Sequence, residues 1–455
     1  MAEPYDYLVL GAGMGGLSAA ALLARTGRRV CLLEAHEHPG GCAHSFTKGP
    51  YTFCAAVHYI FFCGEGEPVY NLLRKLGLHL EVPFDRLDPE GYDHFNCPAE
   101  RLSFRIPNGL DKWADRLVDR FPSHKPGIDR FFSVVGDLGR QLRRLPHALS
   151  WRELLSAPLR FPAVLRYRRW TLEDLFDACR LPRPVRAILA TQVGDLGLPP
   201  GRVSLAIYTA LVHAYGSGAY YPRKGFRHFV EALAGVVRDA PGCRLELNAE
   251  VAQVRFDRGR VAGVKTRDGR EFAAKAVISN MDPAAFVRLA GKEFFPRSFL
   301  RRVAYRHSVS SFTLYLVVRG LDLRRHGFGR WNVWHYPHLD INRTYREQEA
   351  GDLTDPWLFL STPTLHGDGF GCPEGTQILE AVTTCGHAPF RQQLAEDRRA
   401  YLRDKSAVVD RVLDTLDRHY IPGVRKHLAF RMAGLPTTTE PLPASAARQH
   451  LRPRA

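Results

Sequence analysis

The chain has 455 residues, of which 45% are hydrophobic and 11% aromatic, so it can bury large cores in two or three domains and is neither disordered nor fibrous. Its formal net charge of +16 suits an anionic membrane surface or a nucleic acid without identifying either. Nine cysteines without a Cys-x-x-Cys pair argue against a disulfide framework and a structural zinc site, and favour a reducing compartment.

Apolar runs in the sequence are all shorter than the roughly eighteen residues needed to span a bilayer. The N-terminus passes from a short acidic leader into a strand pattern, without the features of a signal peptide. We therefore expect a cytoplasmic protein whose contact with a membrane is peripheral.

The first predicted elements are a strand over 5–10, a glycine turn, an Ala- and Leu-rich helix over 17–25 and a second strand over 29–33. This order within about thirty residues is the dinucleotide-binding fingerprint. Gly11 permits the tight turn, Gly13 lets backbone N–H groups approach a pyrophosphate, and Gly16 lets the helix pack closely on the strand. The glycine turn therefore predicts a site for a dinucleotide at the N-terminus of the helix.

Glu34 ends the second strand, 23 residues after Gly11. A carboxylate there accepts hydrogen bonds from the adenosine ribose and repels a 2′-phosphate, which disfavours NADP. The predicted cofactor-binding residues at this end are Gly11, Ala12, Gly13, Gly15, Gly16, Glu34 and Ala35.

A second glycine pair, Gly40 and Gly41, follows the acidic strand end and is next to Cys42. Flavoproteins bring the backbone against the diphosphate and ribityl chain at this point, whereas an NAD domain normally continues into another helix. The pair favours FAD and leaves an NAD-dependent dehydrogenase as the weaker alternative.

Small residues over 54–57 precede His58 and Tyr59 and could let the chain pass close to a flat ring. His58 and Tyr59 are our candidate catalytic residues beside that ring. The alternative is that His58 is a hydrogen-bonded structural histidine and Tyr59 an ordinary core residue.

Residues 140–170 contain eight arginines and one acid, interleaved with Leu, Pro, Phe and Trp. Such a segment suits a membrane interface, where rings and stems enter the acyl boundary and guanidinium groups bind lipid phosphates. A solvated basic face over a helical core explains the same pattern. Nucleic acid is disfavoured because the sequence contains no nucleic-acid-binding motif.

Alternating apolar and polar residues over 311–318 and 357–362 predict half-buried strands, which could form the floor of a tunnel. A long amphipathic helix is predicted over 391–419. The residues that could line the tunnel, or equally belong to the core, are Trp331, Trp334, His335 and Tyr336. His335 and His338 are three residues apart but have no acidic partner at ligand spacing, so we predict no metal.

Several motifs resemble those of retinol saturase, the phytoene desaturases and the carotenoid cis-trans isomerases, which form one FAD-dependent superfamily. The resemblance spans about residues 4–435. It implies that Gly40, Gly41 and Cys42 flank the ribityl chain, and that the backbone at Val251 contacts the adenine. The matching segments are 27–34, 40–46, 58–60, 192–204, 221–225, the helix 226–237, the hairpin 255–266 with its turn at 258–259, and the strand and loop 276–283.

The C-terminal segment departs from this pattern. Relatives continue into a Gly-rich motif that completes the flavin site, whereas residues 439–455 contain no glycine and no aromatic residue, which predicts a disordered tail over 436–455. One hypothesis is that the chain is truncated. The alternative function is then a non-catalytic remnant, or a lipid-binding protein that holds FAD weakly or not at all.

Together these patterns predict an α/β protein in which a discontinuous Rossmann-like FAD-binding domain, 1–85 and 205–290, carries an inserted α+β substrate domain. The substrate and membrane-interface domain covers 86–204 and 291–435. The resemblance implies an FAD-dependent oxidoreductase that saturates, desaturates or isomerises a hydrophobic polyene or isoprenoid lipid. The expected partners are this polyene and a membrane surface, without nucleic acid, and the oligomeric state has no signature in the sequence.

Overall fold

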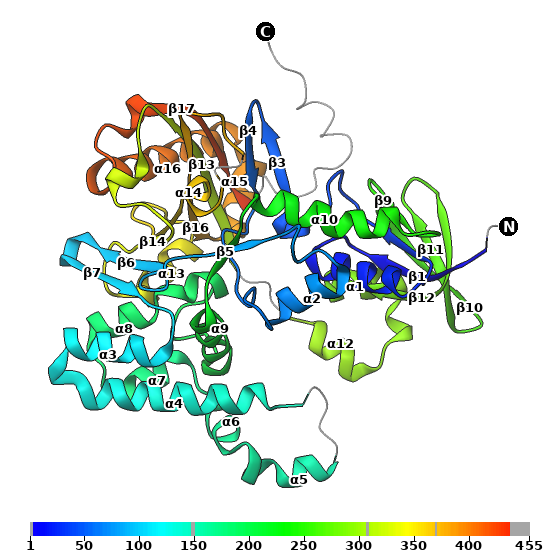
Figure 1. Ribbon diagram of the computed structural model, residues 1–455, viewed down its shortest axis with the longest axis horizontal. Coiled ribbons are helices and arrows are strands. Elements are labelled where there is room, and N and C mark those ends of the chain that lie inside the picture. The colour runs from blue at the N-terminus through cyan, green and yellow to red at the C-terminus, as the bar shows by residue number, and fades with distance from the viewer. Residues whose placement is uncertain (1–2, 147–150, 306–308, 369–370, 437–455) are drawn as a thin grey trace. The chain divides into compact units, whose positions relative to one another are not determined.

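The computed structural model describes residues 3–146, 151–305, 309–368 and 371–436 (Figure 1). Contacts within the chain divide it into two units, and each unit is assembled from segments that are distant in the sequence. Unit 1 comprises Met1–Leu87, Ser217–His307 and Pro363–Glu374, and unit 2 comprises Asp88–Gly216, Ser308–Thr362 and Gly375–Ala455. None of the described helices combines the length and apolar character that crossing a membrane requires.

Unit 1 is built on a mixed sheet with the strand order β10-β11-β12-β1-β2-β9. Strands β12, β1, β2 and β9 run parallel, and β10, β11 and β12 run antiparallel. Leu8, Val9 and Leu10 of the central strand β1 are wholly buried. The strands are β1 (Tyr5–Leu10), β2 (Val30–Leu33), β9 (Arg244–Glu246), β10 (Val251–Asp257), β11 (Arg260–Thr266) and β12 (Glu271–Ser279).

Two helices of unit 1, α1 (Met14–Arg25) and α10 (Gly225–Asp239), pack against each other. Helix α1 begins three residues before its predicted start because Gly13 is its N-cap, and the carbonyl of Gly13 accepts the Leu17 N–H at 2.9 Å. The predicted hairpin turn is confirmed, since Arg258 and Gly259 both have positive φ. The remaining elements of unit 1 are β3 (Ser45–Lys48), β4 (Tyr51–Cys54), β5 (Phe84–Arg86), β8 (Tyr220–Pro222), α2 (Pro68–Leu76), α11 (Pro283–Ala290), α12 (Arg297–Val303) and α14 (Pro363–His366).

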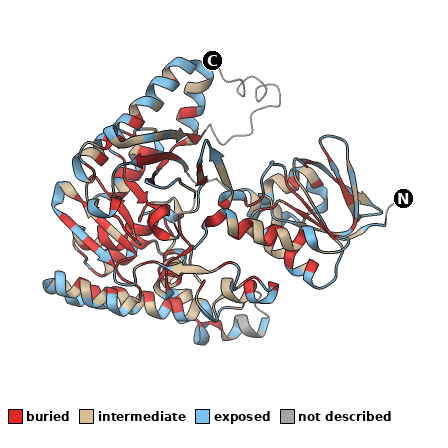
Figure 2. Ribbon diagram, turned by 45° about the horizontal axis from the view of Figure 1, so that its top comes forward, coloured by how far each residue is buried: buried red, intermediate tan, exposed pale blue. Residues whose placement is uncertain are grey.

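Unit 2 contains a sheet with the order β17-β13-β16-β15-β14-β6-β7. Buried residues gather along its strands (Figure 2). The strands are β6 (Asp93–Cys97), β7 (Leu102–Ile106), β13 (Ser310–Arg319), β14 (Asn332–His335), β15 (Leu358–Ser361), β16 (Thr376–Cys385) and β17 (Leu428–Gly434). The helices are α3 (Leu110–Arg120), α4 (Lys125–Arg143), α5 (Trp151–Arg160), α6 (Pro162–Tyr167), α7 (Leu172–Ala178), α8 (Arg183–Leu189), α9 (Leu205–Ser217), α13 (Ile341–Glu349), α15 (His387–Glu396) and α16 (Arg398–His419).

Two predictions for unit 2 are wrong. Residues 311–318 and 357–362 were expected on pattern to be half-buried, but β13 is buried from Phe312 through Val318 and β15 from Leu358 through Ser361. Residues that point to either face of the sheet are therefore packed against other parts of the protein. The predicted helix over 391–419 is two helices. Asp397 separates them, since its carboxylate accepts the N–H groups of Arg399 and Ala400 and thereby caps α16.

The two units differ from the predicted domains at three places. Segment 291–307, which contains α12, was predicted for the substrate domain but lies in unit 1. The predicted second piece of the cofactor domain begins at residue 205, whereas helix α9 lies almost entirely in unit 2, where the Tyr208 hydroxyl donates to the Leu189 carbonyl at 2.8 Å. Segment 363–374 joins unit 1 because the Thr52 N–H donates to Gly371 O at 2.8 Å. The predicted disordered tail lies outside the described residues from position 437 onward.

Candidate functional site

The predicted glycine turn connects β1 to α1 in unit 1. Gly11 has φ +92°, a conformation that favours glycine, and its N–H donates to the Leu33 carbonyl at 2.8 Å. A Cβ at Gly16 would lie 2.0 Å from the carbonyl oxygen of Gly11. Only glycine at position 16 therefore allows α1 to begin directly against the turn.

The second glycine segment lies beside the first. Gly13 and Gly40 form a parallel β-bridge, and the Gly40 N–H donates to the Ala12 carbonyl at 2.7 Å. Gly41 has φ +58°, and a Cβ on it would lie 3.0 Å from the Cα of Gly13. Cys42 is exposed in the short 3-10 turn that follows. The two predicted glycine segments thus lie side by side and form one cradle of backbone. A Cβ on Gly41 would occupy the space between them.

The N-terminus of α1 opens onto this cradle. No side chain of the described residues caps it, and its first turn contains no acid. The first N–H groups of a helix have no partner within the helix, and the helix dipole makes this end positive. Uncapped donors beside a glycine cradle fit a diphosphate group.

Glu34 ends β2 with only 8% of its surface exposed. Its Oε2 accepts the Ala12 N–H at 2.7 Å and its Oε1 accepts the His36 N–H at 3.0 Å. A carboxylate has about four lone-pair sites, so each oxygen retains capacity for a ribose hydroxyl. Glu34 therefore also fixes the glycine turn, a role that its position in the sequence does not reveal. Its neighbour Ala35 is exposed.

Val251 begins β10 and pairs with Thr266. Its side chain is buried in the apolar cluster behind β1 and β2. Two residues earlier, the Ala249 N–H donates to the Glu34 carbonyl at 2.7 Å. The start of β10 therefore lies beside the end of β2. Glu34 and Val251 would have to be neighbours in this way if both contact the same adenosine.

His58 and Tyr59 lie in the loop after β4, and both are buried. The next residue, Ile60, exchanges backbone hydrogen bonds with Tyr220 of β8 at 2.9 and 2.7 Å. The loop is therefore held against β8, in the segment that precedes α10. The role of His58 and Tyr59 beside a ring stays a prediction.

Two features of this region were missed by sequence reasoning. The amide side chain of Asn280 lies over the start of α1, because a Cβ on Gly15 would be 2.7 Å from its Oδ1 and a Cβ on Gly13 3.1 Å from its Nδ2. The position of Asn280 at the end of a strand parallel to β1 was the available signal. The other feature is segment 363–374, which belongs to unit 1. Its His366 ring packs edge-on against the ring of Tyr221, with the two centroids 5.5 Å apart.

Three of the four residues proposed for a tunnel, Trp334, His335 and Tyr336, are buried in unit 2. The fourth, Trp331, is half-buried and stacks on the ring of His94. Trp334 and Tyr336 are buried, and both stack on Trp357, with ring centroids 5.5 and 6.2 Å apart. A Cβ on Gly194 would lie 2.4 Å from the Trp334 ring. Close packing on several sides favours the alternative interpretation of these residues as core.

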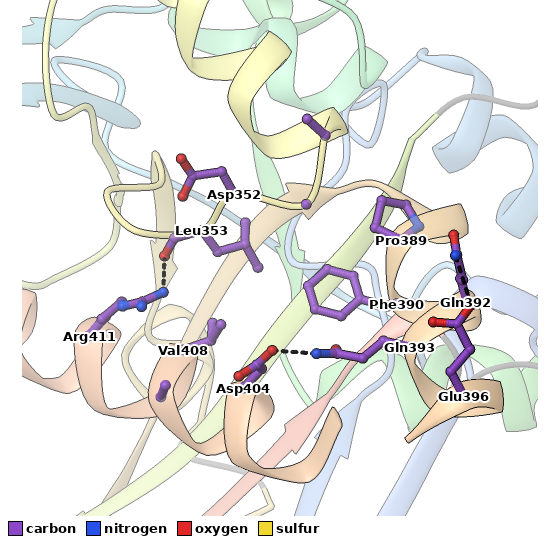
Figure 3. A pocket seen from close by; sticks show the side chains of 13 residues that line it. Asp352, Leu353, Pro389, Phe390, Gln392, Gln393, Glu396, Asp404, Val408 and Arg411 are labelled. Carbon is purple, nitrogen blue, oxygen red and sulfur yellow. Dashed lines mark hydrogen bonds between the residues drawn. The ribbon is translucent and has the colours of Figure 1, made fainter. Parts of the chain in front are cut away.

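A pocket of about 470 Å³ opens in unit 2 between the end of α13 and helices α15 and α16 (Figure 3). Its polar side chains are engaged with one another, since Gln392 Nε2 donates to Glu396 Oε1 at 2.9 Å and Gln393 donates to Asp404. An acidic and amide lining does not suit an apolar ligand, and no predicted site residue lines it. We assign it no role in the predicted chemistry.

His335 belongs to a buried polar cluster of unit 2. Its Nδ1 lies 3.0 Å from the Tyr420 hydroxyl, which also accepts the Asn96 amide at 2.8 Å. Burial, with the nearby His419, lowers the pKa of His335 to about 3. Across the residues that the structure describes, no group of three or more His, Cys, Asp or Glu side chains is placed to hold a metal ion.

His335 should make unit 2 labile to acid. Because its folded pKa lies below the ordinary value near 6.5, the unfolded chain binds the proton more tightly. This contribution to stability is complete above about pH 6.5 and falls by up to about 1.4 kcal/mol per pH unit as the pH decreases toward 3. Denaturant unfolding at pH 7, 5.5 and 4.5 should show a shallower pH dependence for His335→Gln than for wild type.

The control for that measurement is His38→Gln, since the His38 side chain is 53% exposed. This variant should keep the pH dependence of the wild-type protein. Equal slopes for wild type and His335→Gln would contradict the assigned role of the buried imidazole.

Comparison with known proteins gives matches that cover most of the chain. Residues 14–416 match the profile of the family described as flavin containing amine oxidoreductase. The chain is 24% identical to all-trans-retinol 13,14-reductase from Danio rerio, over 96% of this chain and 76% of that protein. It is 28% identical to prolycopene isomerase from Arabidopsis thaliana, over 95% of this chain and 72% of that protein. These relatives confirm the resemblance predicted from the motifs.

Solved structures with a similar fold include two amine oxidases. Cyclohexylamine oxidase from Brevibacterium oxydans has a TM-score of 0.61 at 17% identity, over 95% of this chain and 84% of that chain. Putrescine oxidase bound to putrescine has a TM-score of 0.64 at 15% identity, with the same coverage of 95% and 84%. At these identities the likeness concerns the fold, and it confirms the predicted α/β class with its discontinuous Rossmann-like part.

Proposed function

Because the chain belongs to the flavin containing amine oxidoreductase family, we propose that it is an FAD-dependent oxidoreductase that acts on a polyene or isoprenoid lipid. The observation that carries this proposal is the double glycine cradle at the start of α1 with the Glu34 carboxylate beside it. Membership of the family already implies a flavin-containing oxidoreductase. The adenosine half of FAD and the polyene are the specific parts of our proposal.

The adenosine half is supported by residues that a flavin mononucleotide would not need. Gly11, Gly13 and Gly16 would hold the diphosphate at the uncapped end of α1, where donors are unpaired. Glu34 would accept the ribose hydroxyls on its remaining lone pairs. The backbone near Val251 would contact the adenine.

The flavin end of the site would lie along the second glycine segment. Gly40, Gly41 and Cys42 would follow the ribityl chain, and His58 and Tyr59 would border the ring. A bound flavin supplies hydride transfer to or from a carbon–carbon bond. The buried His58 and Tyr59 would exclude water and orient the ligand.

The polyene is supported by the named activities of the two relatives, a retinol reductase and a prolycopene isomerase. A polyene is insoluble in water, so we propose that the protein meets its substrate at a membrane surface. The basic segment 140–170 favours peripheral contact with that surface.

Visible absorption of the purified chain, before and after addition of excess FAD and removal of the unbound portion, tests the cofactor. Flavin released by heat should chromatograph as FAD rather than as the mononucleotide. The flavin-loaded protein should then convert a retinoid or a cis-carotenoid in lipid vesicles and leave putrescine unchanged. A colourless protein that cannot be reconstituted, or turnover of the amine alone, would contradict the proposal.

Glu34→Ala should weaken FAD binding. Loss of one to two hydrogen bonds to a charged group costs about 1.5–3 kcal/mol each, or roughly 10- to 150-fold in Kd for a single bond. Equilibrium titration of the apoprotein with FAD measures the change. Glu34→Gln should be milder, because the amide oxygen can still accept the Ala12 N–H.

The matched control is Glu37→Ala, since Glu37 is three residues away and its side chain is 77% exposed. It should bind FAD as the wild-type protein does. Thermal unfolding of the three apoproteins separates loss of the ribose contacts from disturbance of the glycine turn. An unchanged Kd in Glu34→Ala would exclude Glu34 from the site.

A further inference from the structure

Helix α5 carries a stripe of large apolar side chains that point into solvent. Trp151, Leu155 and Leu159 are 66%, 73% and 88% exposed. They are spaced four residues apart and therefore lie on one face of the helix. Ala157, on the opposite face, is only 7% exposed. Among its described residues, the helix thus buries a small one and exposes three large apolar ones to water.

The direction of the stripe is set by packing on neighbouring helices. The Phe161 N–H donates to the Ala157 carbonyl at 2.8 Å, and the Phe161 ring is buried between α5 and α6. Helix α6 is in turn held to α4, because Gln141 Oε1 accepts the Ala163 N–H at 2.9 Å. Helix α5 is therefore supported by α6, which in turn packs on α4 (Figure 1). The exposure of the stripe shows that it faces away from this support.

Arginines flank this stripe in the sequence. Residues 140–170 contain eight arginines and a single acid, Glu153. Two guanidinium groups lie over aromatic rings, Arg160 over Phe161 at 5.3 Å and Arg166 over Tyr167 at 5.4 Å. The exposed arginines among the described residues of this segment are Arg140, Arg143, Arg144, Arg160, Arg166, Arg168 and Arg169.

We infer that α5 is the element that docks on an anionic phospholipid surface. Trp151, Leu155 and Leu159 enter the acyl boundary, and the surrounding arginines bind lipid phosphates. An exposed apolar stripe within a strongly basic segment is complementary in both polarity and charge to such a surface. This inference names the partner surface in the proposed function and rests on that function for its purpose.

A second copy of the chain is a poorer occupant of the stripe. In a twofold dimer the same patch faces itself, so each arginine cluster would meet the other. Like charges brought together across an interface oppose association. The lipid surface has no such penalty, and it is therefore the occupant to which we commit.

Co-sedimentation of the full chain with vesicles tests the inference. Binding to phosphatidylcholine vesicles that contain anionic phosphatidylglycerol should exceed binding to pure phosphatidylcholine by at least about tenfold, because several arginines are attracted to the negative surface. The double variant Leu155→Glu with Leu159→Glu should lose about the same factor on the anionic vesicles. Both positions are exposed, so circular dichroism and thermal unfolding should be unchanged.

Leu80→Glu is the matched control. Leu80 is 85% exposed but belongs to unit 1, outside the basic segment, and its variant should bind vesicles as the wild-type protein does. Vesicles with brominated acyl chains should quench part of the tryptophan fluorescence, and Trp151→Phe should abolish that part. Equal binding by wild type and the double variant would overturn the inference.

Two further measurements distinguish the inference from the proposed function and from self-association. Flavin content and turnover of substrate in detergent should be unchanged in the double variant. If the wild-type protein binds no flavin but still docks through α5, the proposed function is contradicted and this inference is not. Sedimentation velocity should give the same mass for wild type and double variant. A change from dimer to monomer with unaltered vesicle binding would assign the stripe to a second copy.

Discussion

Gly16→Ala should abolish retention of the flavin. A Cβ at this position would lie 2.0 Å from the Gly11 carbonyl oxygen, and that oxygen belongs to backbone that cannot rotate away. Helix α1 would have to move off the turn, which would displace the N–H groups that face the cradle. Such overpacking costs about 1–3 kcal/mol, occasionally more. Here the strain would be relieved by moving the backbone that forms the proposed binding site. The measurement is the ratio of flavin to protein after purification.

Gly235→Ala is the matched control in the same unit. Gly235 also lies in a helix, α10, but the nearest atom to its added Cβ is Asp239 Oδ2 at 3.9 Å. The variant should retain flavin and gain up to about 1 kcal/mol in stability from helix propensity. Full flavin content in Gly16→Ala would contradict the assignment of the glycine turn.

Gly139→Ala should destabilise unit 2, although local propensity alone predicts the opposite. Gly139 lies within α4, where alanine is favoured over glycine by up to about 1 kcal/mol. In the structure the added Cβ would be 1.9 Å from Nε2 of His213. That ring is held on both sides, by the Val135 carbonyl at 3.0 Å and by Arg143 Nη1 at 3.0 Å. We expect a net loss of about 1–3 kcal/mol in the free energy of unfolding.

Gly136→Ala provides the comparison within the same helix. The closest atom to its Cβ is Arg140 Nη1 at 3.5 Å, the end of a flexible side chain. This variant should therefore gain helix propensity without the steric cost that Gly139→Ala carries. His213→Ala should rescue Gly139→Ala by removing the ring. Urea unfolding of the four proteins checks both signs, and equal stabilisation by the two glycine substitutions would refute the steric argument.

The local part of the fold could be predicted because neighbouring residues alone produce it. An apolar run, three glycines, an Ala-rich helix and Glu34 specify β1, the turn, α1 and β2, and the structure contains all of them. Hairpin β10–β11 was predictable for the same reason, since Arg258 and Gly259 take the positive φ values that a tight turn requires. The family and the fold class follow from these local motifs.

Tertiary structure decided what local sequence does not contain. The bond from the Ala12 N–H to Glu34 spans 22 residues, and the Asn280 amide reaches the start of α1 only because β12 pairs with β1. The burial of β13 depends on packing against both faces of its sheet, and the cost of a methyl group at Gly139 depends on His213, 74 residues away. The sequence by itself determined β1, α1, β2 and the hairpin β10–β11, and it predicted a dinucleotide site at the start of α1. Distant packing decided which face is buried, which glycine tolerates a side chain, and which side chains meet, because these depend on contacts between segments that lie far apart in the chain.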